Sequence, residues 1–413
     1  MRANSSRLAS PALARLREIA ADPARLEPVV WRLLCGFAFC VPLSIVLAEG
    51  MLAITAAAAI RYWWLCGRPR VRTPLDWPIL AFLASAILAA LVGLDPPHSF
   101  WGLRTYLQVI IVYVVYAHVR GDENRALELL GWFLAGMAVT SVYRVLFVLS
   151  PWPLPRLFVG RMTQAGQLLF AVAAAAALSL RRALWPRLLP YLLTLYALAV
   201  LVTLKRGAWL GTAVALTIVG GMRSRLLVLI VLVVPLVAIA TIPPVRARVE
   251  HTARDLYLPG NRYDIWRSTI DVIHRFPMGV GRKNGMILRD YPNIPQNHKH
   301  AHNNLLQITM EDGYLGAVAF VWWMASFGVL SWRVLRAIAP ERPSSAVALA
   351  VFSTFVGFHC AGLVEYNFGD SEVLEVFFIM MGLGLALRAE ANVHSKESVA
   401  SSRQGELGRA LSG

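Results

Sequence analysis

Long apolar runs separated by short polar segments dominate the chain. We predict twelve membrane-crossing helices from these runs, near residues 30–47, 51–66, 77–94, 103–119, 127–149, 163–180, 184–203, 207–222, 225–243, 313–335, 345–364 and 371–388. Most of the runs approach or reach the roughly 17–25 apolar residues that a helix needs to cross a bilayer. Because lipid offers no hydrogen-bond partner to an open backbone, the pattern predicts an all-α, polytopic integral membrane protein.

The predicted helices divide the chain into five parts. A tail (1–28) precedes transmembrane helices 1–9 (29–243), and a large loop (244–312) connects them to transmembrane helices 10–12 (313–388). The chain closes with a polar, Ser- and Glu-rich tail (389–413) that we expect to be disordered. A connection as long as the loop is usually functional or contains short elements of its own.

The composition agrees with a membrane protein and argues against a soluble class. Hydrophobic residues make up 57% of the chain and charged residues 15%, whereas soluble domains carry about 45–50% and about 25%. The net charge of +16 could indicate nucleic acid in a soluble protein. Here arginines at helix ends explain it better, so we expect no nucleic-acid partner.

The short loops predict the orientation of the chain, because Lys and Arg concentrate in cytoplasmic loops. The arginine-rich set contains Arg68, Arg70, Arg72, Arg120, Arg125, Arg181, Arg182, Arg187, Arg223, Arg225, Arg333, Arg336 and Arg342. The opposite set contains only Arg156, Arg161, Lys205 and Arg206. Both termini are therefore predicted to be cytoplasmic, and the large loop lies on the other side.

The large loop is itself basic and contains a predicted helix. Within residues 244–312, Lys and Arg outnumber Asp and Glu, which suggests an anionic substrate or anionic lipid headgroups. Residues 261–276 read as a helix that begins after Asn261, with Arg262, Trp266, Ile270 and Ile273 on one face. A second helix is predicted from His302 to Asp312, just before transmembrane helix ten.

Three alternating histidines, His298, His300 and His302, lie at the end of the loop. Alternating imidazoles suggest a zinc or copper site, but no Asp or Glu stands at ligand spacing beside them, so we expect no metal. His302 differs from the other two because it opens a helix that leads into the membrane. An imidazole there can act as a general base near neutral pH.

Several cations on the predicted outer side are candidates for binding phosphate. Lys205 and Arg206 oppose the charge bias of the loops, and Arg262 lies on the loop helix; Arg161 and Arg282 are weaker candidates. One guanidinium group can bind two phosphate oxygens at once, and it keeps its charge. Each of these residues can equally be an interfacial anchor. Glu365 and Asp370 at the outer end of helices eleven and twelve could orient a base, or simply mark a turn.

At these residues the chain resembles bacterial O-antigen ligases, within the membrane O-antigen ligase/polymerase superfamily. His302-Asn303 followed after nine residues by Gly313 and then Gly316 resembles the family signature. Arg206-Gly207-Ala208-Trp209 resembles the arginine at a span end. Arg262 with Trp266, followed by the stretch Phe276–Gly281, resembles the arginine-to-glycine stretch in the loop.

The resemblance implies a metal- and cofactor-independent glycosyltransferase of the bacterial inner membrane with its active site facing the periplasm. It would transfer polysaccharide from undecaprenyl pyrophosphate to the lipid A–core, with inversion and with His302 as general base. Arg206 and Arg262 would hold the pyrophosphate. Asn303, Arg161, Arg282 and Lys205 would bind substrate, and membrane lipids would surround the protein.

Three alternatives remain open. An O-antigen polymerase or a protein O-oligosaccharyltransferase of the same superfamily would use the same donor with another acceptor. A lipid or glycolipid transporter is the alternative from a different class. Transporters usually show internal repeats and charges near the midplane, whereas the candidate residues here gather at one predicted membrane edge.

Overall fold

The computed structural model describes residues 18–67, 71–150, 155, 157–296 and 298–388, and every regular element within these ranges is a helix. The first half contains α2 (Pro23–Cys40), α3 (Ile45–Leu65), α4 (Asp76–Val92), α5 (Pro96–Leu107), α6 (Ile110–Val119), α7 (Glu123–Leu149) and α8 (Arg161–Arg181). The second half contains α9 (Leu189–Thr203), α10 (Arg206–Arg223), α11 (Arg225–Thr241), α12 (Pro243–Tyr257), α13 (Arg262–Arg275), η1 (Gly285–Asp290), α14 (Asn304–Ala337), α15 (Pro343–Gly362), η2 (Asn367–Gly369) and a last helix at 371–388. The predicted all-α class is confirmed. The predicted C-terminal tail and residues 1–17 of the N-terminal tail lie outside the described residues.

The predicted apolar runs fall largely on these helices. Six helices of the described chain are long and apolar enough to cross a membrane, namely α3, the joined stretch Pro96–Val119, α7, α8, α14 and α15. The pair α11 and α12 makes a seventh if it is one span, although it is bent by 102°. α4 and α9 are apolar but have only 17 and 15 residues. The chain is a multi-pass membrane protein, and the count of twelve spans stays a prediction.

The long helices pack side by side around α8. This helix contacts α9, α10 and α15, and most of its apolar stretch is buried. Its middle is a run of alanines at residues 173–177, which lets neighbouring helix backbones approach closely. The central position of α8 fixes where the ends of α10 and α15 lie, and both ends contribute to the site described below.

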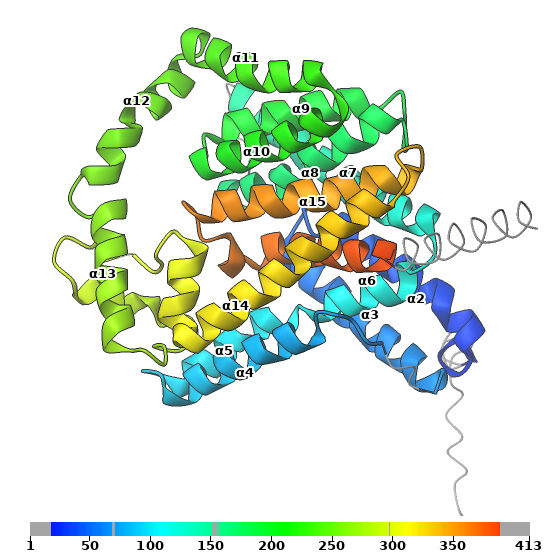
Figure 1. Ribbon diagram of the computed structural model, residues 1–413, viewed down its shortest axis with the longest axis horizontal. Coiled ribbons are helices and arrows are strands. Elements are labelled where there is room, and N and C mark those ends of the chain that lie inside the picture. The colour runs from blue at the N-terminus through cyan, green and yellow to red at the C-terminus, as the bar shows by residue number, and fades with distance from the viewer. Residues whose placement is uncertain (1–17, 68–70, 151–154, 156, 297, 389–413) are drawn as a thin grey trace, which may run out of the picture.

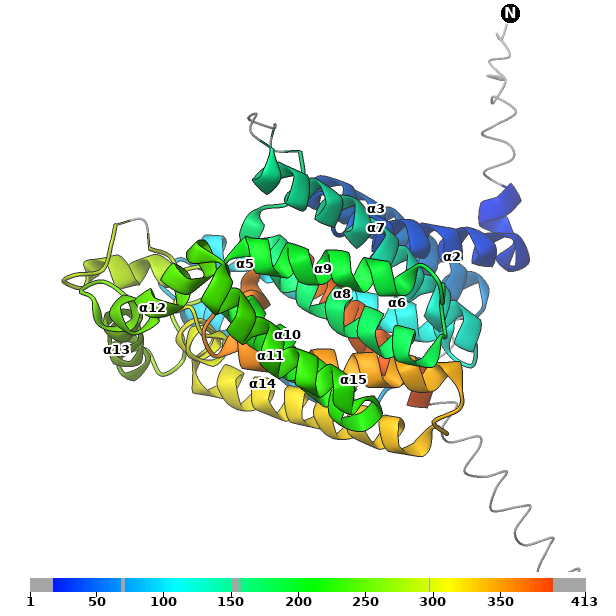
Figure 2. The same ribbon diagram turned by 90° about the horizontal axis from the view of Figure 1, so that it is seen from above.

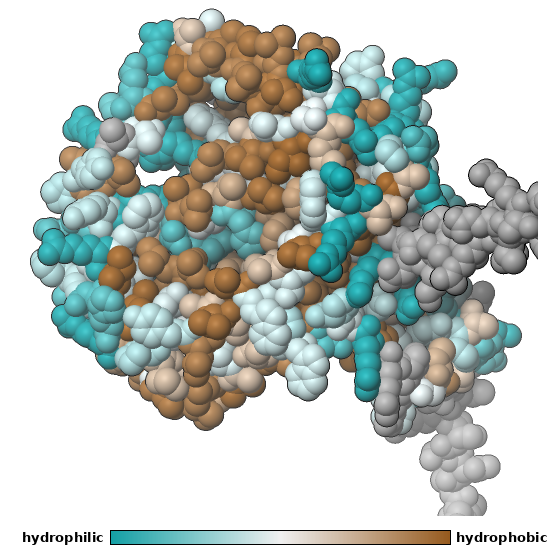
Figure 3. Space-filling view, in the orientation of Figure 1, coloured by the Kyte–Doolittle hydropathy of each residue, from teal (hydrophilic) through white to brown (hydrophobic). Residues whose placement is uncertain are grey.

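The two ends of the bundle differ. α12 and α13 lie at one end, and α2 and the last residues of the 371–388 helix lie at the other (Figures 1 and 2). The face in Figure 3 is mostly apolar along its middle, and hydrophilic residues gather toward both ends. An apolar belt between polar ends is the surface that a bilayer requires.

The large loop is more helical than the sequence analysis predicts. The helix predicted at 261–276 is confirmed as α13, but α12 before it is not predicted. α12 begins with Pro243 and Pro244, whose fixed φ suits the first turn of a helix. The face that carries Ile270 and Ile273 is only partly buried, because Ile270 is 44% exposed, whereas Ile265, Val272 and Ile273 are buried. α13 packs against α14 and η1, and helical periodicity does not reveal which side meets these neighbours.

The segment before transmembrane helix ten is a helix joined to the span by a kink. α14 runs from Asn304 to Ala337, and Gly313 inside it has φ 71° and ψ −175°. Residues 304–312 therefore form a separate helical piece, which agrees with the prediction of a second loop helix ending at Asp312. A left-handed φ favours glycine because it has no Cβ, so Gly313 sets the angle at which the loop enters the membrane-spanning part.

Candidate functional site

His302 is held at the start of α14 by its neighbour. Asn303 is the N-cap residue, and its Oδ1 accepts a hydrogen bond from the Leu306 N–H at 3.0 Å. Its Nδ2 donates to the Leu363 carbonyl at 2.9 Å, which ties the head of α14 to the segment after α15. His302 itself has a left-handed φ of 50°. A strained non-glycine backbone is often found at functional positions, and here it points the imidazole toward this junction.

Glu365 lies between Arg262 and His302. Its Oε1 is 3.1 Å from an Arg262 guanidinium nitrogen, and its Oε2 is 3.4 Å from His302 Nδ1. Arg262 also donates to the carbonyls of His302 and Val364. One arginine thus holds the backbone of both segments and the carboxylate between them.

The carboxylate defines which imidazole nitrogen is available for chemistry. With Nδ1 facing Glu365, a proton on Nδ1 is favoured and Nε2 is left as the basic nitrogen. The 3.4 Å approach does not meet hydrogen-bond geometry, and such contacts often tighten when substrate binds. Burial disfavours the charged form of Glu365, but the approach of His302 and the charges of Arg262 and Lys205 outweigh it and lower its pKa.

A glycine makes room for this carboxylate. A Cβ atom on Gly207 would lie 2.4 Å from Glu365 Cγ, so any larger residue would displace the side chain. Gly207 directly follows Arg206, the first residue of α10. The Arg206-Gly207 pair therefore places a guanidinium group next to the space that the Glu365 side chain fills.

Three arginines surround one cavity beside His302. A cavity of about 290 Å³ is lined by Arg206, Arg248, Asn261, Arg262, Ile265 and His302; we call it the arginine cavity. It borders a groove of about 440 Å³ between α10 and α12. The groove combines the same three arginines with apolar side chains such as Leu210 and Leu256. Guanidiniums at the head of an apolar groove match a ligand with an anionic head and a lipid chain.

A second, larger cavity lies on the other side of Glu365. Its volume is about 540 Å³, and we call it the lysine cavity because Lys205, Lys283 and Lys299 line it. His300, Glu365 and Tyr366 also contribute to its wall. Glu365 lines both this cavity and the groove beside the arginine cavity, so the carboxylate stands between the two spaces.

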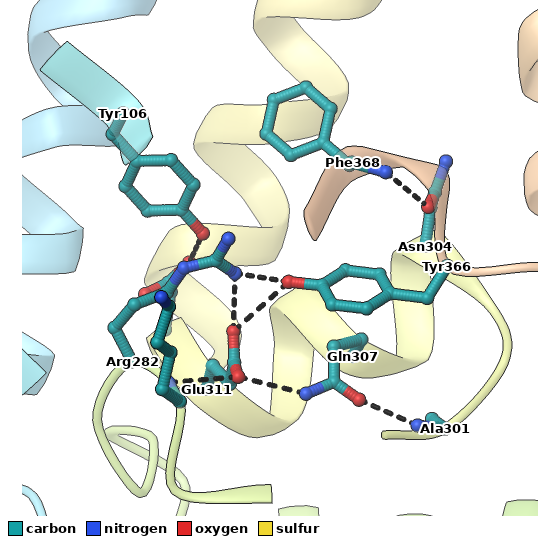
Figure 4. A network of polar contacts seen from close by, with 10 residues as sticks. Tyr106, Arg282, Ala301, Asn304, Gln307, Glu311, Tyr366 and Phe368 are labelled. Carbon is teal, nitrogen blue, oxygen red and sulfur yellow. Dashed lines mark hydrogen bonds and ion pairs between the residues drawn. The ribbon is translucent and has the colours of Figure 1, made fainter. Parts of the chain in front are cut away.

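A buried polar network forms one wall of the lysine cavity (Figure 4). Arg282 is paired with Glu311 and bonded to the Tyr366 hydroxyl, which also donates to Glu311. Gln307 Nε2 donates to Glu311 at 2.9 Å, and Gln307 Oε1 accepts from the Ala301 N–H at 2.6 Å. Burial opposes the charge on Arg282, but Glu311 and the surrounding acidic groups raise its pKa well above the ordinary value. The network fixes the segment that carries the histidines.

A glycine turn and the glycine kink of α14 bring this network together. The turn Pro277–Gly281 docks on the kink of α14, where the Val280 and Gly281 N–H groups donate to the carbonyls of Met310 and Glu311. Gly279 has φ 93°, and a Cβ there would lie 2.4 Å from the Glu311 carbonyl oxygen. The contact places Arg282, the next residue after the turn, beside Glu311.

The three histidines form a cluster of rings but do not form a metal site with acidic partners. The ring centroids of His300 and His302 are 4.1 Å apart, and that of His298 lies 5.3 Å from His302. Among the described residues no group of three His, Cys, Asp or Glu side chains is arranged to hold a metal ion. Burial, followed by His302 and His298, lowers the pKa of His300 to about 3. His300 is therefore neutral at physiological pH.

The structure gathers most of the predicted site residues but separates two of them. His302, Asn303, Arg206 and Arg262 meet at one point, and Lys205 borders it. Arg161 is exposed at the start of α8 and does not line the cavities described above. Arg282 lines the lysine cavity, but it is only 1% exposed and paired with Glu311.

Two important residues lack a decisive sequence signal. Glu365 stands out only as a carboxylate just after an apolar run, which is also how an ordinary turn looks. Arg248 is one of several arginines in an unpredicted helix.

Comparison with known families agrees with the motifs. Residues 191–321 match the family model described as O-Antigen ligase, and the resemblance inferred from the motifs is confirmed over this stretch. No protein of curated function matches the chain. The matched region includes Arg206, Arg262 and His302, whereas Glu365 lies beyond it. The match supports a place in the O-antigen ligase/polymerase superfamily of glycosyltransferase-like membrane enzymes.

Proposed function

We propose that the protein transfers O-antigen polysaccharide from undecaprenyl pyrophosphate to a sugar of the lipid A–core. The observation that carries this proposal is the convergence of His302, Glu365, Arg262 and Arg206 at one end of the bundle. Three of these residues come from the stretch that matches the ligase family. We place this end of the molecule at the periplasmic face of the inner membrane, because the arginine-rich short loops lie at the opposite end of the predicted topology.

The proposed reaction gives each of these groups a role. His302 Nε2 takes the proton of the acceptor hydroxyl, whose oxygen attacks the anomeric carbon of the donor sugar. The bond between that carbon and the phosphate oxygen breaks, and its electron pair leaves with undecaprenyl pyrophosphate. Attack from the face opposite the leaving group inverts the anomeric configuration.

The surrounding charges support each half of this step. Glu365 orients His302 and stabilises the imidazolium that forms. Arg206 and Arg262 hold the pyrophosphate and stabilise the charge that it gains as it leaves. The groove between α10 and α12 accommodates the first part of the lipid chain. The step needs neither a nucleotide nor a metal ion.

The acceptor decides between this proposal and the polymerase reaction. A ligase uses lipid A–core, whereas a polymerase adds the glycan to another lipid-linked repeat and a protein oligosaccharyltransferase adds it to a hydroxyl of a protein. All three reactions would use the same base and the same arginines. A transporter would move the lipid-linked glycan without forming a new bond.

The test is transfer by purified protein in nanodiscs, supplied with lipid-linked polysaccharide and each acceptor in turn. We expect ladder-forming product with lipid A–core, its loss in His302→Ala, and a milder effect of His300→Ala. His274→Ala changes an exposed histidine on α13 and serves as the matched control. Normal transfer by His302→Ala would refute the base, and product with only a lipid-linked repeat would replace the ligase by a polymerase.

A further inference from the structure

We propose that the lysine cavity binds an anionic substituent, a phosphate or a carboxylate, on the glycan that reacts at His302. This inference rests on the proposed function and specifies its substrate. The pyrophosphate of the donor is not this anion, because the arginine cavity lies on the other side of Glu365.

The cavity has the size and the mixed character of a binding site for a sugar. Its volume of about 540 Å³ falls in the range of about 300–1,000 Å³ that is usual for ligand pockets. One side is apolar, with Met162 and Leu169 from α8 and Ala361 from α15. The other side presents amide and hydroxyl groups, including those of Gln307 and Tyr366. The cavity thus offers an apolar surface for the face of a pyranose ring and polar groups for its hydroxyls.

Three lysines from separate segments meet at this cavity. Lys205 lies between α9 and α10, and Lys283 and Lys299 flank η1. Within the part of the chain that the structure describes, none of the three forms an ion pair with a carboxylate. Lysines without partners around a concave surface form an electrostatic site for an anion.

The carboxylates in the same wall are already engaged. Glu311 is paired with Arg282 and Glu365 with Arg262. Asp370 accepts a hydrogen bond from Thr163 at 2.7 Å, and burial raises its pKa. With Glu311 and Glu365 paired to arginines, the three lysines outnumber Asp370, the remaining carboxylate among the lining residues, so the lining is net positive.

Partial burial of Lys205 supports the same conclusion. Burial, followed by the charge of Arg161, lowers the pKa of Lys205, whereas Lys283 and Lys299 are exposed. Removing cations from water is unfavourable unless a partner of opposite charge is present. A bound phosphate or carboxylate supplies that partner, and lysine contacts it as a point charge without imposing a fixed geometry.

The anion can come from either substrate. A phosphate can be carried by the inner sugars of the acceptor, and a carboxylate or phosphate can be carried by the donor glycan. The experiment therefore compares wild-type protein with the double variant Lys283→Gln/Lys299→Gln, which leaves Lys205 beside Glu365 in place. Arg254→Gln/Arg267→Gln removes two exposed charges from α12 and α13 and is the matched control.

Transfer is measured with native and enzymatically dephosphorylated acceptor, each with a neutral and an acidic donor glycan. We expect the lysine variant to raise KM for a charged substrate by about tenfold, with kcat nearly unchanged. If the effect disappears after dephosphorylation, the anion is on the acceptor. If it disappears only with the neutral donor, the anion is on the donor. An equal KM for charged and uncharged substrates, or a fall in kcat for all of them, would overturn the proposal.

A binding measurement separates this proposal from the proposed function. Phosphorylated and dephosphorylated core oligosaccharides, and short acidic and neutral donor-type glycans, are titrated into the full-length protein without any turnover. The lysine variant should lose the preference for the charged member of one pair, whereas the arginine control should keep it. If wild-type protein transfers nothing to lipid A–core but still shows this preference, only the ligase reaction fails. If wild-type protein binds the charged and uncharged members of both pairs equally, the anion site fails.

Discussion

Replacing Glu365 with glutamine removes the negative charge between Arg262 and His302 while it keeps the volume of the side chain. At 3.4 Å, two unit charges attract by about 5 kcal/mol at an effective dielectric constant of about 20. This value is an upper limit, because the side chains of His302 and Glu365 are 22% and 15% exposed and because Arg262 shares the carboxylate. The net loss should be about 1.5–3 kcal/mol, the range for a hydrogen bond to a charged group.

We therefore expect Glu365→Gln to lower kcat by about ten- to a hundredfold. The acidic limb of the pH–rate profile should also move to lower pH, because a neutral amide stabilises imidazolium less than a carboxylate does. Glu365→Asp, which keeps the charge but shortens the reach, should be intermediate. The assay is single-turnover transfer of lipid-linked glycan to lipid A–core, measured from pH 5 to 9. Glu250→Gln changes an exposed carboxylate on α12 and should behave like wild type.

A double-variant cycle distinguishes action through His302 from general damage to the site. If Glu365 acts through the imidazole, adding Glu365→Gln to His302→Ala should cost little more, because residues that act as a unit are not additive. A full second loss in that background would show that Glu365 acts mainly through Arg262. Turnover of Glu365→Gln within about twofold of wild type, with an unchanged pH profile, would refute the reasoning entirely.

Three further predictions concern the arginines, metals and the glycine turn. Arg206→Lys and Arg262→Lys should insert normally but transfer about ten- to a hundredfold more slowly, because lysine lacks the bidentate fork; near-normal turnover of both would make them membrane anchors. Transfer should persist in excess EDTA, and loss on chelation that one metal restores would assign His298 and His300 as ligands. Gly279→Ala should destabilise the fold by about 1–3 kcal/mol because of its positive φ, seen as a lower Tm, whereas Gly50→Ala, with open space around its Cβ position, should not.

The sequence by itself determines the class of protein and the kinds of side chain in the candidate site. In lipid every backbone group must be bonded within its own helix, so apolar runs reveal helices without any tertiary information. The charge bias of the loops, the helix at α13 and the break before transmembrane helix ten can be predicted for similarly local reasons. His302, Arg206 and Arg262 stand out because their types and surroundings are unusual for the segments that contain them.

The tertiary structure decides which of these groups act on each other. Glu365 lies 63 residues after His302 and 103 after Arg262, and only the packing of α15 against α10 and α14 brings it between them. The same packing pairs Arg282, a predicted substrate-binding residue, with Glu311 in a buried network that lines the lysine cavity. Local patterns encode helices because helical hydrogen bonds join residues four apart. Local patterns do not reveal the partner of a buried charge. That partner comes from another helix, so it depends on how the helices pack against each other.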